Sequence, residues 1–385
     1  MPVPLDPCQQ QAGPEEMRRL WNQCSIVEPM EENEIVTDIT VARNLAGNSE
    51  YHDNFQSVQA VAGEKLGRAT QKSLFDRLEW LTQLHTLCLA ENKPLIIHSS
   101  ENSAEAWLFL MEKNQGNYTA LANWYNFTYR PIFVGNYGNG TKLGLLTAVA
   151  KKLPLHCHHI EIAPVPDEDD AASLTEQAFK QAGWLVLKSK ADDNHILSVN
   201  GRTFEEYWSG RPGRLRNTVR RKAKKNIVSI RIETDFSDEH WNHYLDVYSQ
   251  SWKPEEGNPD FLKNLAKQES DAGCLRLGLA YIDGAPVAAQ FWTVENGEAL
   301  IHKLAHVEDA TKSSPGTLLS VAMFRHVIDV DGVDIIDFGT GNDAYKLEWM
   351  EEVRLRYRLE MFWPKSPKSW LPILRHTISA LVGKR

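Results

Sequence analysis

The stretch 275-LRLGLAYIDGAPVAAQFWTVENGEALIHKLAH-306 decides the fold expected for this chain. Two turn-forming pairs, Asp283-Gly284 and Asn296-Gly297, divide it into three apolar segments of strand length. Such pairs favour the type I′ turn of a tight hairpin. The stretch therefore predicts three successive antiparallel strands, at residues 275–282, 286–294 and 299–306.

The flanking segments extend this pattern. After a loop, residues 315–330 predict a helix and residues 333–338 a short strand, so the order is strand, strand, strand, helix, strand. Upstream, a helical pattern over 73–92 precedes a less regular repeat of that order, with candidate strands at 94–99, 106–111 and 118–123. These strands lack equivalent turn pairs, so the repeat is a hypothesis. We expect an α+β (mixed α/β) fold, each half a mostly antiparallel sheet flanked by helices.

The length of 385 residues exceeds one ordinary core and predicts two domains. A helix that ends near Gln181, followed by a strand at 184–187, closes the first of them. We expect four parts: an irregular N-terminal segment at 1–50, a first domain at 51–195, a catalytic domain at 196–352 and a basic amphipathic tail at 353–385.

Composition excludes several classes of protein. The net charge of -9 argues against a protein that wraps nucleic acid over its whole surface. Five scattered cysteines without a CxxC pair indicate neither a disulfide framework nor a zinc ribbon, and we expect no metal. No secretory signal and no apolar run of about 18 residues is found, so the sequence predicts a cytoplasmic protein that does not span a membrane.

A candidate anion site lies where the helix at 315–330 begins. Ser314 suits the N-cap, Pro315 the first turn, and Gly316 lets a phosphate approach the free amides of the helix. A common helix start would have the same sequence, and only its position in the strand order favours a site. The predicted pyrophosphate loop comprises Lys312, Ser313, Ser314, Pro315, Gly316 and Thr317.

A second candidate follows the strand at 333–338. There the chain runs into glycines and then presents polar side chains, in the sequence 337-DFGTGNDAYK-346. Strand ends of this kind often hold functional sites. The glycines are equally compatible with a plain turn, and Tyr345 with half-buried packing.

These two motifs together resemble the FemAB-related, CelD-like branch of the GNAT acyltransferases. The matching residues are 314–316, 337–341 and Tyr345-Lys346, supported by the basic stretch 207–225 and by Ser251-Trp252-Lys253. The loop at 312–317 is poorer in Gly and in Arg or Gln than the best-known GNAT phosphate loop. The resemblance implies two GNAT-like domains in tandem and an acyl-CoA thioester laid along the strand that ends near His306.

Single residues near these motifs are candidates for the catalytic roles, and the family pattern does not fix which of them is the base. Tyr345 is the candidate general acid, and His306, with His302 in reserve, is the candidate base because imidazole titrates near neutral pH. Asp337 would orient Lys346 or the incoming amine, or form a structural ion pair. The remaining candidates, for substrate binding, are Trp252, Lys253, Gly339 and Gly341.

Three functions follow as alternatives. The first is N-acylation of a small-molecule or lipid amine, either a long-chain sphingoid base or an envelope amino sugar, by a coenzyme A thioester. The second is a FemAB-type transfer from aminoacyl-tRNA, which shares the duplicated fold. The third is a non-enzymatic protein that binds an anionic membrane surface, such as the inner membrane, through the basic stretch 211–225 and the tail.

Overall fold

The computed structural model describes the backbone of residues 48–341 and 343–382. Almost all of the irregular segment expected at 1–50 therefore lies outside the described residues. The strands and helices of the first half are β1 (Asn48–His52), α3 (Phe55–Ala62), α4 (Leu78–Cys88), β2 (Pro94–Glu101), β3 (Ala104–Asn114), β4 (Asn117–Ala120), β5 (Ile132–Val134), α5 (Asn139–Lys152), β6 (His159–Val165), α6 (Ala171–Gln181) and β7 (Leu185–Ser198).

The second half carries the strands predicted from the 275–306 stretch. Its elements are α7 (Phe204–Ser209), α8 (Gly213–Ala223), β8 (Ser229–Glu233), α9 (Asp238–Ser249), α10 (Pro259–Asp271), β9 (Leu275–Ile282), β10 (Ala285–Glu295), β11 (Glu298–His306), α11 (Pro315–Asp329), β12 (Ile335–Thr340), α12 (Lys346–Trp349), β13 (Glu352–Phe362) and α13 (Pro367–Val382). All four residues of the two turn pairs have φ between 49° and 82°, as type I′ turns require.

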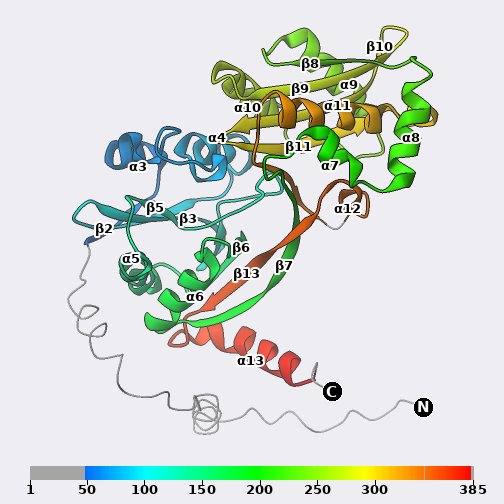
Figure 1. Ribbon diagram of the computed structural model, residues 1–385. Helices are drawn as coiled ribbons and strands as arrows, with labels where there is room; N and C mark the ends of the chain where they lie inside the picture. The colour runs from blue at the N-terminus through cyan, green and yellow to red at the C-terminus, as the bar shows by residue number, and fades with distance from the viewer. Residues whose placement is uncertain (1–47, 342, 383–385) are drawn as a thin grey trace, which may run out of the picture. The chain divides into compact units, whose positions relative to one another are not determined.

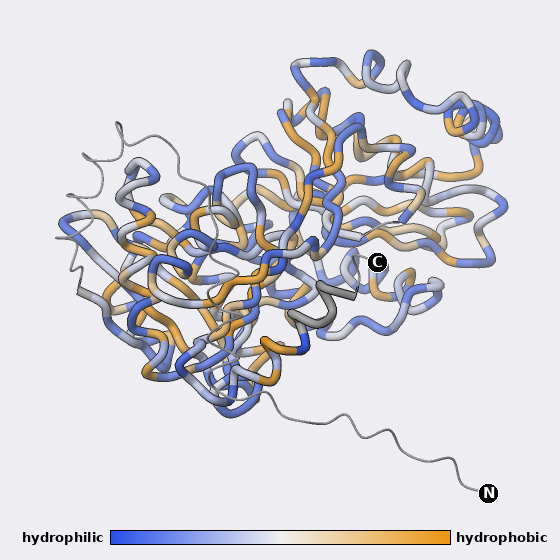
Figure 2. Tube along the Cα trace, turned by 90° about the horizontal axis from the view of Figure 1, so that it is seen from below, coloured by the Kyte–Doolittle hydropathy of each residue, from blue (hydrophilic) through white to orange (hydrophobic). Residues whose placement is uncertain are grey.

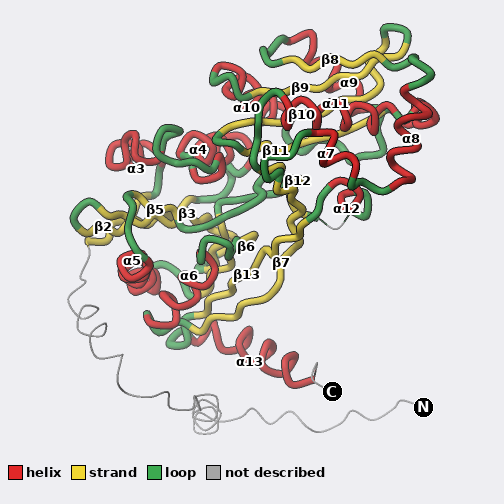
Figure 3. The backbone as a smooth tube through the Cα atoms, viewed as in Figure 1, coloured by secondary structure: helices red, strands yellow, loops and turns green. Residues whose placement is uncertain are grey.

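One sheet runs through both halves, in the order β1-β2-β3-β4-β6-β13-β7-β12-β11-β10-β9-β8, with β5 paired to β3 (Figures 1 and 3). The first four strands are antiparallel neighbours, and β6 returns parallel to β4 after α5. The second half repeats this plan, because β8 to β11 are antiparallel and β12 returns parallel to β11 after α11. The duplicated, mostly antiparallel α+β fold is confirmed.

The two halves exchange their last strands. Strand β7 of the first half pairs with β12, and β13 inserts between β6 and β7. Residues 353–362, which the sequence assigned to the C-terminal tail, therefore form a central strand with Leu359 and Met361 fully buried. The domain limits themselves stay a prediction.

Aromatic packing joins the halves as well. Trp80 of α4 meets Phe261 of α10 edge to face at 5.1 Å, and Tyr125 stacks on the same Phe261 ring at 4.8 Å. Both contacts belong to one apolar core cluster that contains residues of both halves. Figure 2 shows orange, hydrophobic segments mainly in the interior of the trace and blue, hydrophilic ones mainly on its outer turns.

The helix predicted at 73–92 is shorter than expected. A 3₁₀ turn at Leu74–Asp76 and helix α4 are separated by Arg77, which has extended backbone geometry. The Arg77 guanidinium is buried, donates to the Gln71 and Lys72 carbonyls and pairs with Glu295 of β10 at 2.6 Å. These contacts satisfy most of a buried guanidinium at the point where the helical pattern is interrupted.

Candidate active site

Strands β11 and β12 pair over three residues only, from Glu298 opposite Ile335 to Leu300 opposite Asp337. Beyond that point residues 301–306 of β11 and 338–340 of β12 diverge, and we call the opening between them the strand split. Backbone groups that face it have no ladder partner on the neighbouring strand, so they are free to bind a ligand.

Helix α11 begins beside the strand split. Ser314 stands at its N-cap with φ 54° and makes no side-chain capping bond, and Pro315 has no amide hydrogen. The amides of Gly316 and Thr317 have no hydrogen-bond partner in the described part of the chain. Gly316 approaches His306 so closely that a Cβ there would lie 3.2 Å from the imidazole Nδ1. The predicted loop therefore presents open amides at a helix N-terminus, which favour an anion.

Helix α8 brings positive charge to this loop. The Lys222 amine donates to the Lys312 carbonyl. Residues 213–225 carry no acid, and their basic members are Arg214, Arg216, Arg220, Arg221, Lys222, Lys224 and Lys225. A one-sided cluster of this kind raises the local concentration of anionic ligands.

His306, Trp252 and Lys253 meet at the end of β11. The His306 and Trp252 rings lie 4.4 Å apart. Burial lowers the pKa of His306, with Glu308 opposing that shift, so the imidazole is neutral at physiological pH. Burial, aided by the Lys303 charge, lowers the pKa of Lys253 to about 8. Burial therefore favours the neutral form of both groups, and Lys253 can exchange a proton near neutral pH.

Asp337 and Lys346 hold the end of β12. The Asp337 carboxylate accepts from the Asn194 amide at 3.1 and 3.2 Å and from the Gly339 N–H at 2.7 Å. The Lys346 amine donates to the Thr340 carbonyl at 2.5 Å and the Gly339 carbonyl at 3.4 Å. Among the described residues no Asp337–Lys346 ion pair forms, so both side chains fix the strand end instead of contacting each other.

Tyr345 follows this turn and is 37% exposed. Its ring packs edge to face on Phe338 at 5.6 Å. Burial and the Asp343 charge raise the pKa of its hydroxyl well above the usual value, so it keeps its proton at working pH. The other predicted glycines shape the turn: Gly339 has φ 70° against the Phe127 ring, and a Cβ on Gly341 would lie 3.5 Å from the Lys346 amine.

His302, the reserve base, is a core residue. Its Nε2 bonds the Thr293 hydroxyl at 2.9 Å, and its ring stacks on Phe291. Burial lowers its pKa to about 3, so it accepts a proton poorly near neutral pH.

The sequence did not reveal two further groups. Glu298 lies at the base of the strand split, where burial and the nearby Asp337 raise its pKa to about 7. Further along β11, Lys303 pairs with Glu256 at 2.8 Å, and Tyr125 of the first half donates to that carboxylate at 2.6 Å. No local motif marks these residues, because their partners are distant in sequence.

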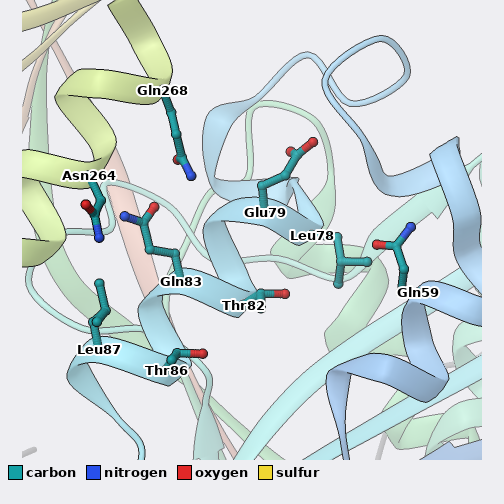
Figure 4. Close-up of a pocket in the computed structure, with 9 residues that line it drawn as sticks. All are labelled: Gln59, Leu78, Glu79, Thr82, Gln83, Thr86, Leu87, Asn264 and Gln268. Atoms are coloured by element: carbon teal, nitrogen blue, oxygen red, sulfur yellow. The ribbon is translucent and has the colours of Figure 1, made fainter. Parts of the chain in front are cut away.

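A separate groove of about 440 Å³ lies between α3, α4 and α10 (Figure 4). Its side chains are mostly amides and hydroxyls, with Glu79 the one acid among them. It contains none of the predicted site residues.

One family model matches part of the second half of the chain. Residues 213–347, from α8 to α12, match the family model of an acetyltransferase (GNAT) domain. The match spans 135 of the 385 residues. The matched segment indicates an enzyme of the N-acyltransferase class, while the CelD-like branch stays a prediction. No curated protein matches the sequence.

Solved structures share the fold of this chain. The C-terminal domain (DUF2156) of an inferred lysylphosphatidylglycerol synthetase from Agrobacterium fabrum has a TM-score of 0.53 at 14% identity, with 85% of this chain and 98% of that chain covered. L-PGS from Bacillus licheniformis gives 0.51 at 14% identity, with 86% and 98% covered. FemX gives 0.54 at 11% identity, with 81% and 96% covered. At these identities the likeness concerns the fold alone.

Proposed function

We propose that the protein transfers an acyl group from coenzyme A to a primary amine. The observation that carries this proposal is the strand split beside a helix whose Gly316 and Thr317 amides have no internal partner. Coenzyme A fits such a place because its pyrophosphate would lie on those amides, with α8 supplying positive charge. Its extended pantetheine arm would bond the free backbone edge of β11.

The thioester supplies the acyl group, and side chains of the protein accept and donate the protons. A reacting amine must be neutral, and its proton can pass to the neutral imidazole of His306 or to Lys253, whose pKa burial lowers to about 8. In this proposal Tyr345, which keeps its proton, lies next to the departing thiolate and donates that proton to it. Asp337 and Lys346 act as positioning residues for the strand end.

The acceptor class follows from the tail. Trp370, Leu371 and Leu374 of α13 are 51%, 58% and 41% exposed, beside Lys368 and Arg375. An apolar face with flanking basic residues suits the surface of an anionic membrane. This favours a lipid amine, such as a long-chain base, over an envelope amino sugar. None of the described helices combines the length and apolarity needed to cross a bilayer.

Thermal unfolding with each donor tests the proposal. Coenzyme A alone should raise the melting temperature in proportion to ln(1 + [L]/Kd), and acyl-CoA with a long-chain amine should yield an amide detectable by mass spectrometry. Stabilisation by aminoacyl-tRNA but not by coenzyme A, with steep salt dependence, would instead favour the FemAB-type donor. FemX shares the fold, which is why this second candidate is kept.

Replacing Trp370, Leu371 and Leu374 together with serine tests the membrane component. Vesicle binding should fall while transfer to a water-soluble short-chain amine is retained. If all membrane-dependent activity persists, the tail is not the anchor.

A further inference from the structure

Two buried histidines and a carboxylate converge at the edge of the sheet, on the first half. Glu50 of β1 lies directly opposite His98 of β2 in the antiparallel register, and His52 lies two residues further along β1 on the same face. One ligand atom from each of the three lies within 4.8 Å of the others. His52 and His98 are only 7% and 5% exposed, whereas Glu50 is exposed.

The tautomer of His52 follows from its neighbours. The Ser57 hydroxyl donates to the Asn54 carbonyl at 2.9 Å, so its oxygen can only accept from the imidazole Nδ1, 3.1 Å away. His52 therefore carries its proton on Nδ1. Its Nε2 is left with a bare lone pair, buried and without a hydrogen-bond partner. A ligating histidine typically donates its other nitrogen in this way.

His98 is held in a similar manner. Its ring stacks on Trp107 at 4.0 Å, and its Nε2 lies 3.5 Å from the Glu105 carboxylate. Glu105 is itself fixed, since it accepts from the Trp107 indole at 2.9 Å and from Lys65 at 2.5 Å. Neither ring nitrogen of His98 has a hydrogen bond. A carboxylate beside a ligating histidine is the usual outer arrangement of zinc sites.

We propose that Glu50, His52 and His98 bind a divalent transition metal, with zinc as the best fit. Two imidazoles and one carboxylate match the ligand preference of Zn²⁺, and water would complete a tetrahedral site. Zinc–nitrogen bonds of about 2.0–2.1 Å put tetrahedral ligand atoms about 3.3 Å apart. The three ligand atoms, which now lie within 4.8 Å of one another, would move closer together on binding. Burial lowers the pKa of both histidines, so ligation needs no proton release from them near neutral pH.

The position indicates a structural role. In the sheet order, five strands separate β2 from β12, so the metal would not contact the acyl group. It would instead link the edge strand β1 to its neighbour β2. Edge strands have one unpaired side and open readily, and a metal that binds only the folded state stabilises it.

Calorimetric titration of the chelator-stripped full chain, without an affinity tag, tests the site. Zinc should bind at one equivalent and raise the melting temperature, and Co²⁺ should give the visible absorption of a tetrahedral nitrogen–oxygen site. Because Glu50 is exposed, Glu50→Gln should fold normally and weaken zinc by ~10–100-fold or more, and His52→Gln by at least as much.

The matched control is His326→Gln. His326 Nε2 lies 3.7 Å from the Asp331 carboxylate in the second half, so this variant removes a histidine–carboxylate pair elsewhere. It should bind zinc as the wild type does. The proposal is overturned if the wild type binds no zinc, or if Glu50→Gln and His52→Gln retain wild-type affinity.

Discussion

Burial sets the protonation of the side chains around the strand split. Glu298 and Lys253 both have pKa values moved towards neutrality, to about 7 and about 8, by removal from water. Such groups cost stability in their charged forms and are retained where chemistry needs them. Substitutions of two single residues test the protonation states proposed for this site.

The first test concerns Glu298. Its folded pKa is raised from 4.5 to about 7, so the folded protein loses stability as pH rises through that interval. Glu298→Gln should match the wild type at pH 4 and exceed it by on the order of 1–3 kcal/mol at pH 8 in urea unfolding. Glu308→Gln is the control, and parallel pH profiles for wild type and Glu298→Gln would contradict the assignment.

The second test concerns Tyr345. Tyr345→Phe should lower kcat by ~10²–10⁴-fold with little change in melting temperature, because the ring stays packed on Phe338. Tyr137→Phe removes a comparable hydroxyl, bonded to Ser103, from the first half and should leave kcat unchanged. Equal rates for wild type and Tyr345→Phe would remove the proton donor from the proposal.

Local sequence could predict some residues of the site but not their partners. The helix start at 314–317 is readable because capping chemistry acts within a few residues. Asn194, which bonds Asp337 across 143 positions, is not readable, since it meets that carboxylate only through the pairing of β7 with β12. Glu298 looks like an ordinary strand residue until its burial is known.

Elements differ in how far the sequence determines them. Strands β9 to β11 were predictable because each is bounded by a turn pair with its own backbone requirement. The break at Arg77 and the central place of β13 were not, because both depend on distant partners, Glu295 and the strands β6 and β7.

Charge reversal on helix α8 tests whether its basic residues assist coenzyme A binding. Arg220→Glu combined with Arg221→Glu should weaken coenzyme A several-fold and flatten the salt dependence of its binding, because the positive field beside the loop is reversed. Lys151→Glu with Lys152→Glu, at the end of α5, makes the same charge change away from the strand split. If both double variants bind alike, α8 does not assist the donor.

At the scale of the whole molecule, strand exchange makes the halves interdependent. Ending the chain after residue 351 should prevent folding of both halves, because β6 and β7 lose their shared partner and the buried Leu359, Met361 and Phe362. Ending it after residue 365 keeps β13 and should preserve the fold by circular dichroism. A folded, cooperative 1–351 fragment would show that the exchange is dispensable.

Calorimetric titration with coenzyme A of two glycine variants tests the central claim most directly. Gly316 and Gly140 both lie in the first turn of the helix between parallel strands, one in each half. Gly316→Glu places a negative charge at the open amides and should reduce affinity by more than tenfold, whereas Gly140→Glu should bind as the wild type does. The reverse result, or unchanged binding in Gly316→Glu, would contradict the account.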